Sequence, residues 1–248
     1  MKEYFSILGF KIEKTTSFTS LAAFVLAIWA AAYTVVSFMQ GPRLDLIQPE
    51  AIVAYKDYCE HQRHPTVAFV VRVSVINSAP KDYASVLHDF RLRFNDGSGD
   101  GKIYEFYAEK FAQFGDATDA KKGRVGCENE EYDDAIYYVE TSSFTNDVLV
   151  EGSSLFSSEL LFLPFVPPCE NGQMSCYSQN YLEYEKFVEL VKRNSQNVVS
   201  KLPFTIHILH DYSNSQQKGC SVHTNQSVVW ALEEFMHFDV NCVERLSL

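Results

Sequence analysis

The stretch TVAFVVRVSVIN, residues Thr66–Asn77, decides the fold class of this 248-residue chain. Every second position in it is apolar: Val67, Phe69, Val71, Val73 and Val75. The positions between them are mixed, with Arg72 and Ser74 polar. This alternation predicts a β-strand, because successive side chains of a strand point to opposite faces of the sheet. The partly apolar second face predicts that the strand is central in its sheet.

The same alternation recurs in shorter segments along the chain. In VLHDFRLRF, the residues expected to face the core are Phe90, Leu92 and Phe94. Those expected to face the solvent are Arg91 and Arg93. Further strands are expected in KIYEFYAEKF, AIYYVET, ELLFLPF, FTIHILHDY and CSVHT. Many short strands separated by turns are typical of an antiparallel sandwich or barrel. We therefore predict a mainly β fold, an elaborated antiparallel β-sandwich over residues 66–248.

Two segments depart from the strand pattern. YLEYEKFVELVKRNSQ, residues 181–196, has apolar residues at helical spacing, which predicts a helix inserted into the β domain. SVVWALEEFMHFDV, residues 227–240, fits a helix over its first half and a strand over its second half. Both interpretations of residues 227–240 stay open, so the sandwich is expected to carry one or two helices.

An apolar run, LAAFVLAIWAAAYTVVSFM (Leu21–Met39), precedes the β-rich region. No charged residue lies between Lys14 and Arg43. A helix of roughly 20 mostly apolar residues spans the ~30 Å hydrocarbon core of a bilayer. We therefore expect a single transmembrane signal-anchor helix over residues 18–39, preceded by a short tail at residues 1–17.

A cleaved signal peptide is the alternative, with Ala30 and Ala32 as the small residues before the cut. The apolar run continues past that point, which favours an uncleaved anchor. Three lysines precede the run: Lys2, Lys11 and Lys14. Because basic residues favour the cytoplasmic side, we expect a cytoplasmic N-terminus and a periplasmic, extracellular or lumenal C-terminal domain. Residues 40–65 would then form a tether and the first strand.

All six cysteines follow the apolar run: Cys59, Cys127, Cys169, Cys176, Cys220 and Cys242. An even number of cysteines in an exported domain predicts up to three disulfides, for which fifteen pairings are possible. The first pair expected is Cys169 with Cys176, which flank a turn-rich loop. Cys220 and Cys242 bracket a segment that can return on itself, and this leaves Cys59 with Cys127.

Residues 40–248 are acidic, with 18 basic and 30 acidic residues and a net charge of −12. An acidic domain repels nucleic acid and anionic lipid surfaces, so nucleic acid is excluded as an expected partner. Such a domain attracts cations or a basic face of another protein. Solubility alone also accounts for the charge.

The segment FNDGSGDGKIYEF, residues 94–106, has part of the pattern of a calcium-binding loop. Asp96, Ser98 and Asp100 stand at alternating positions, as oxygen ligands do in such loops. Tyr107 stands where the pattern expects a bidentate glutamate. The alternative is a polar hairpin turn, in which Asp-Gly pairs supply positive φ angles. We retain these three residues as candidate calcium ligands and expect no other cofactor.

The tyrosines near the predicted strand ends have two interpretations, a recognition surface or part of the core. They are Tyr55, Tyr58, Tyr104, Tyr107, Tyr132, Tyr137 and Tyr138. Histidines at His61 and His64 are three residues apart, but no further metal ligand is evident near them. The sequence has no nucleophile elbow and no phosphate-binding loop, so no enzymatic activity is expected.

In layout, the chain resembles the broad class of single-pass proteins that carry an immunoglobulin-like sandwich outside the membrane. It lacks the Cys…Trp…Cys spacing of true immunoglobulin domains. We predict a non-enzymatic interaction protein, an accessory subunit of a membrane or envelope complex whose partner is another membrane or envelope protein. The alternative is an ectodomain that binds a small molecule or a cation such as calcium.

Overall fold

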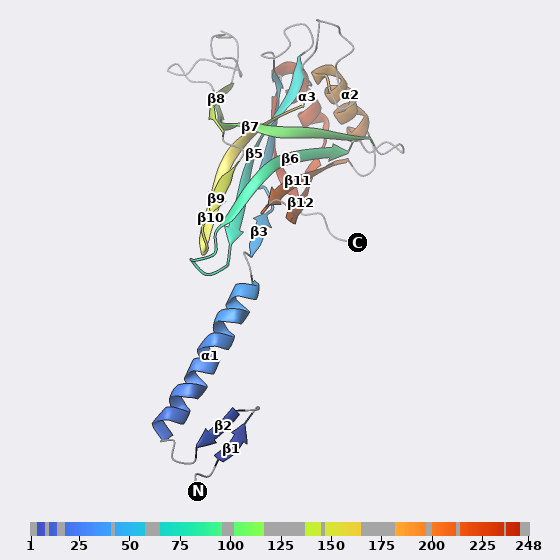
Figure 1. Ribbon diagram of the computed structural model, residues 1–248. Coiled ribbons are helices and arrows are strands. Elements are labelled where there is room, and N and C mark those ends of the chain that lie inside the picture. Colours follow the sequence, from blue (N-terminus) through green and yellow to red (C-terminus); the bar gives the residue numbers. More distant parts are fainter. Residues whose placement is uncertain are drawn as a thin grey trace, which may run out of the picture. The chain divides into compact units, whose positions relative to one another are not determined.

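The computed structural model of the chain (Figure 1) forms two compact units, Met1–Arg43 and Leu44–Leu248, and each is described by itself. The structure describes residues 4–7, 10–13, 18–40, 43–57, 65–95, 102–116, 137–144, 147–164, 182–196, 200–211, 214–235 and 237–243.

The first unit contains a short hairpin and one helix. Strands β1 (Tyr4–Ile7) and β2 (Phe10–Glu13) pair antiparallel. They lie within residues 1–17, for which only a short tail was predicted. Helix α1 (Phe18–Gln40) covers the apolar run. Within the parts of the chain set out above, no helix is both long and apolar enough to cross a membrane. The transmembrane prediction for residues 18–39 is therefore not confirmed.

The second unit is mainly β, as predicted. In the described part of the chain its strands form one eleven-stranded antiparallel sheet. The strands are β3 (Leu44–Ile47), β4 (Ala51–Asp57), β5 (Thr66–Asn77), β6 (Ser85–Asn95), β7 (Ile103–Asp116), β8 (Tyr137–Ser143), β9 (Val148–Val150), β10 (Ser154–Pro164), β11 (Lys201–His210), β12 (Asn214–His223) and β13 (His237–Val243).

The hydrogen-bonded order of the strands is β8-β7-β10-β5-β4-β13-β12-β11-β6-β9, with β3 also beside β5. Strand β6 pairs with β11 along one edge, and along the other it pairs with β9 over Ser85–Leu87 and with β7 over Arg91–Asn95. The β6–β7 pairing returns the path to β7, so the sheet closes on itself. The finer prediction of a sandwich, immunoglobulin-like or otherwise, is not confirmed, because the strands belong to one continuous sheet.

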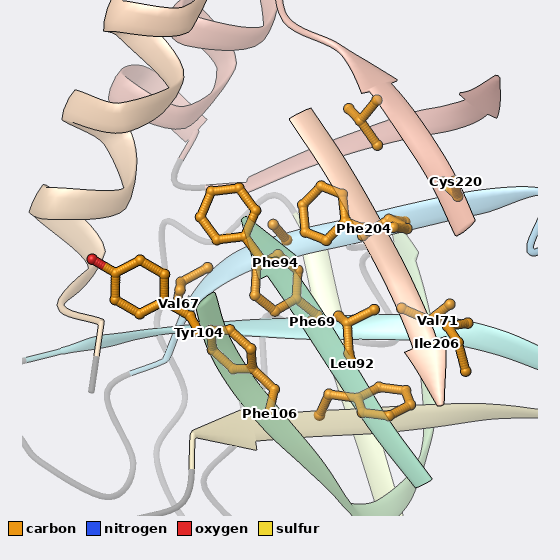
Figure 2. Packing of buried hydrophobic residues seen from close by; sticks show 14 of the residues in the cluster. Val67, Phe69, Val71, Leu92, Phe94, Tyr104, Phe106, Phe204, Ile206 and Cys220 are labelled. Carbon is orange, nitrogen blue, oxygen red and sulfur yellow. The ribbon is translucent and has the colours of Figure 1, made fainter. Parts of the chain in front are cut away.

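The prediction of a central strand at Thr66–Asn77 is confirmed. Strand β5 pairs with β10 on one side and with β3 and β4 on the other. Its alternating apolar residues face the main core, where Phe69 packs edge-to-face against Phe106 and Phe204 (Figure 2). Ala68 and Val70 face a second, smaller apolar cluster. The second face is therefore covered at Ala68 and Val70, whereas Arg72 and Ile76 farther along the same face are exposed.

Two helices pack against the main core. Helix α2 (Tyr184–Ser195) lies inside the predicted helical segment 181–196. Its Phe187 is buried, with ring centroids 5.6 Å from Phe69 and 5.9 Å from Phe94. Helix α3 (Gln226–Phe235) is followed directly by β13. The ambiguous segment 227–240 is therefore helix in its first half and strand in its second.

Strand β5 connects two different ends of this unit. At one end, Thr66 bridges to Glu183, just before α2 begins, and we call this the helical end. At the other, Asn77 pairs with Leu44, the first residue of β3, and we call this the Leu44 end. The buried Asn77 amide donates to the carbonyl oxygens of Tyr83 and Val150, which ties neighbouring segments together there.

Candidate interaction surface

Trp230 on α3 is an aromatic side chain that the second unit leaves open to solvent, with 55% of its surface exposed. Helix α3 buries Val228, Val229 and Leu232 against the core, which places Trp230 on its outer side. The Trp230 ring lies edge-to-face against Phe235, with centroids 4.6 Å apart. Exposed tryptophans are enriched at the centres of protein–protein interfaces, so this pair is the first candidate for a binding surface.

Helix α3 is fixed to its surroundings by polar contacts at both ends. At its start, Asn225 Oδ1 accepts a hydrogen bond of 2.9 Å from the backbone N–H of Val228, as an N-cap residue does. Farther along, the buried Tyr184 hydroxyl of α2 donates to the carbonyl oxygen of Leu232 at 2.9 Å. These contacts hold α3 in one orientation on the core, so Trp230 is presented on a rigid support.

The surface beside Trp230 is acidic. Glu233 and Glu234 follow it on α3, both are exposed, and α3 has no basic residue in its sequence. Lys192 of α2 forms an ion pair with Glu233, with Nζ and Oε1 3.0 Å apart. An exposed aromatic side chain with neighbouring carboxylates fits a partner that offers an apolar pocket and basic residues.

A pocket of about 200 Å³ lies on the outer face of the sheet. Its apolar lining comes from Val53, Val70 and Phe114. Arg72 of β5 and Glu159 of β10 also line it and form an ion pair of 2.7 Å. Small-molecule sites usually have volumes of about 300–1,000 Å³, so this pocket is small for such a ligand.

A polar network crosses β6, β7 and β11 on the outer face. Arg93 donates to Glu105 at 2.6 Å, and its guanidinium also lies 3.2 Å from Nε2 of His207. Arg91 forms an ion pair with Asp89 and lies over the Tyr107 ring, 5.2 Å from its centroid. Each arginine forms an ion pair with a carboxylate. The network is therefore balanced in charge and stabilises the pairing of these strands.

The pKa directions in this network follow from its contacts. The hydrogen bond to Asp89 raises the pKa of Arg91. Burial raises the pKa of the Tyr107 hydroxyl above its ordinary value. Burial, followed by the charge of Arg93, lowers the pKa of His207. His207 is therefore neutral at pH 7, and its ring can accept a hydrogen bond from Arg93.

A serine, an aspartate and a histidine meet at the Leu44 end. The Asp211 carboxylate accepts hydrogen bonds from the Ser85 hydroxyl at 2.8 Å and from the backbone N–H of Val86 at 3.2 Å, and it lies 3.0 Å from Nδ1 of His210. In a serine hydrolase the imidazole must contact the nucleophile, whereas here the carboxylate does. Ser85 is also buried. The arrangement holds the start of β6 rather than activating a nucleophile.

Most of the predicted site residues lie outside the described residues. These are the calcium candidates Asp96, Ser98 and Asp100, and the cysteines Cys59, Cys127, Cys169 and Cys176. The remaining pair, Cys220 and Cys242, forms a disulfide, as expected from the segment that they bracket. In the parts of the chain that can be described, no three His, Cys, Asp or Glu side chains gather closely enough to hold a metal ion.

The interpretation of the tyrosines as a recognition surface is wrong for two of them. Tyr55 and Tyr104 are buried in the two apolar clusters. Trp230 was not singled out in the sequence, although a signal was present. If Val228 and Leu232 face the core in a helix, the residue midway between them must point away from it.

Comparison with known proteins identifies no relative: no family model, no curated protein and no solved structure matches this chain.

Proposed function

We propose that this protein is a single-pass, membrane-anchored accessory subunit whose β domain docks onto another membrane or envelope protein and catalyses no reaction. The exposed Trp230, packed against Phe235 and held on a rigid helix, is the observation that carries the proposal. Trp side chains of this kind often dominate binding energy, and truncating one typically costs at least ~2 kcal/mol of binding free energy.

The anchor is supported by the sequence of the first unit. The uncharged run Leu21–Met39 has about the number of apolar residues that a spanning helix needs, although no helix of the described residues is both long and apolar enough to cross a membrane. Helix α1 has no charged residue, and its apolar side chains from Phe24 to Val36 include many that are exposed. Lipid would cover such side chains. The lysines before α1 support a cytoplasmic N-terminus and a β domain on the other side of the membrane.

The position of Trp230 supports a protein partner. Helix α3 contacts α2 at the helical end, and the β domain follows α1 at its Leu44 end. The twelve residues of β5 separate these two ends by about 36 Å along the strand, at 3.3 Å for each of its eleven steps. If α1 lies in the membrane, Trp230 is carried on the far end of the domain. Its neighbours Glu233 and Glu234 fit a partner with a basic face.

The alternative of a small-molecule site has weaker support. The pocket beside Arg72 has a volume of about 200 Å³, below the usual range for such ligands. Calcium binding at Asp96, Ser98 and Asp100 stays a sequence-based prediction. No catalytic role is proposed for Ser85, Asp211 and His210, because the serine hydroxyl contacts the carboxylate and not the imidazole.

The proposal is tested by purifying the full-length protein in mild detergent from the membranes of cells that make it. The wild type is compared with Trp230→Ala and with Val243→Ala, which removes an exposed apolar side chain of β13. We expect the wild type and Val243→Ala to retain the same protein in a fixed ratio. Trp230→Ala should bind it about 30-fold more weakly, the equivalent of ~2 kcal/mol.

Both variants change exposed side chains, so their free energies of unfolding should stay within about 0.5 kcal/mol of the wild type. The assignment of Trp230 to the docking surface is wrong if Trp230→Ala retains the partner as well as the wild type does. The subunit role itself is wrong if the wild type is recovered alone.

A further inference from the structure

The outer face of the β5–β10 pair changes character between Arg72 and Ile76, beyond the buried apolar pair Val70 and Leu161. Toward the helical end, Arg72 is paired in register with Glu159 as an ion pair of 2.7 Å. The next outward pair, Ser74 with Ser157, is a hydroxyl–hydroxyl hydrogen bond of 2.8 Å. The last outward pair, at the Leu44 end, is Ile76 with Leu155. The ladder thus runs from charged through polar to apolar toward the Leu44 end.

Two more exposed apolar side chains lie near that last pair. Ile47 of β3 is in register with Ser74, and Leu149 adjoins Val150, whose carbonyl oxygen accepts from Asn77. We call this set the apolar rim: Ile47, Ile76, Leu149 and Leu155, with 38%, 39%, 62% and 59% of their surfaces exposed. Scattered apolar side chains on a surface are ordinary, whereas a group of them at one end of a domain is a candidate contact site.

The chain between α1 and the rim is short. Helix α1 ends at Gln40 and β3 begins at Leu44. Four residue steps reach at most about 14 Å, even when fully extended. Asp45 of β3 is in register with Ile76, so the rim lies one strand spacing from the start of the domain. The chain therefore enters the β domain next to the rim.

From these relationships we infer that the apolar rim rests in the interfacial region of the lipid bilayer, next to the point where α1 leaves it. This inference rests on the proposed function, because it takes α1 as the anchor. A lipid surface suits the rim, since apolar side chains at this depth replace contact with water by contact with the acyl boundary. Asp45 and Glu151 beside the rim favour zwitterionic over anionic lipid.

The consequence is a fixed orientation. A single helix with a short connection leaves a domain free to tilt, whereas a rim seated in the interface holds it upright. The helical end, with Trp230 on α3, would then be the end of the domain that faces away from the membrane. Lipid contact by the rim and protein contact by Trp230 are therefore two separable functions of the two ends.

Photo-crosslinking of the full-length protein in phosphatidylcholine vesicles tests the inference. Benzoylphenylalanine is placed at a rim position (Leu155→benzoylphenylalanine), in the middle of α1 (Trp29→benzoylphenylalanine) and at an exposed position of α2 (Glu189→benzoylphenylalanine). Ile76→benzoylphenylalanine is a second rim position, in case the first variant does not fold. We expect lipid adducts from the rim and α1 positions and none from Glu189.

The outcomes separate the rim from the anchor. Lipid adducts at Trp29 without any at Leu155 or Ile76 would contradict lipid contact by the rim, but would leave the membrane location of α1 supported. The absence of lipid adducts at Trp29 would contradict the proposal that α1 is the membrane anchor. It would also contradict lipid contact by the rim, because that inference takes α1 as the anchor. Adducts from Leu155 to a protein instead of lipid would overturn the lipid assignment, because the rim would then face a partner.

Discussion

Cys220 on β12 and Cys242 on β13 are joined by a disulfide, with their Cα atoms 5.4 Å apart. The two strands share a short ladder, in which Ser221 is in register with Val243 and Val222 with Cys242. The sheet closes only if β12 and β13 stay together, because its path runs through both strands. The disulfide therefore secures a point of closure that has few backbone hydrogen bonds.

Removing this disulfide should destabilise the β domain by about 3 kcal/mol. The two cysteines are 22 residues apart, and the chain entropy released on opening such a loop gives this magnitude. The measurement is urea unfolding of the Cys220→Ala/Cys242→Ala variant beside the wild type. An unchanged free energy of unfolding would show that the backbone pairing alone holds the closure.

Phe187→Ala should be among the most damaging changes in α2. The Phe187 ring is buried among Phe69, Phe94 and Phe238, and deleting a buried phenylalanine side chain costs about 3–5 kcal/mol. The control is Lys186→Ala, whose exposed ion pair with Glu183 contributes little. Thermal unfolding followed by circular dichroism checks both. Similar melting temperatures for the two variants would contradict the packing of α2 on the core.

Asn77→Ala should destabilise the Leu44 end by about 3 kcal/mol or more. The Asn77 amide donates to the carbonyl oxygens of Tyr83 and Val150, and its Oδ1 accepts from the N–H of Ala79. Truncation leaves these backbone groups without their partner in a buried site, at about 1–3 kcal/mol for each buried group. Hydrogen exchange should show faster exchange at Ala79 than in the wild type. Exchange at Ala79 as slow as in the wild type would mean that the Asn77 side chain does not hold the backbone of Ala79 in place.

Asp211 should make the stability of the fold depend on pH in the acid range. Burial alone would raise the pKa of Asp211, but hydrogen bonds from His210, Ser85 and Val86 outweigh it and lower that pKa below its ordinary 3.8. The ionised carboxylate therefore stabilises the fold above pH 3.8, and this contribution is lost as the pH falls through the lowered pKa.

The comparison for this prediction is Asp211→Asn, because asparagine also tolerates the positive φ of 49° at this position. We expect the wild type to be more stable than Asp211→Asn at pH 5 and above, where the carboxylate is ionised. The margin should shrink below about pH 4. Urea midpoints measured over this range check it, and a margin independent of pH would contradict the role assigned to the carboxylate.

The sequence predicted those parts of the fold that depend on local periodicity. The alternation at Thr66–Asn77 identified β5 and its central position, and the helical spacing at residues 181–196 identified α2. The closure of the sheet was not predictable in the same way. It depends on pairings between distant segments, such as β6 with β7 and β11, and periodicity does not specify which strands pair. The segment 227–240 was ambiguous because its apolar residues fit both periods until α3 ends at Phe235.

The surfaces were less predictable than the fold. Trp230 could have been found, because its helix buries Val228 and Leu232 on the opposite side. The apolar rim could not, because Ile76 and Leu155 become neighbours only through the register of β5 with β10. The sequence left the tyrosines open between a recognition surface and the core, since a tyrosine near a strand end is buried or exposed according to what packs over it, as for Tyr55.

The most direct test of the central claim is the mass of the full-length protein, purified in mild detergent from the membranes of cells that make it. We expect native mass spectrometry to show a species heavier than the 28.3 kDa chain by one other polypeptide in a fixed ratio. That species should fall to the mass of the chain alone in Trp230→Ala. A wild-type protein found only at 28.3 kDa, or at whole multiples of it, would contradict the account.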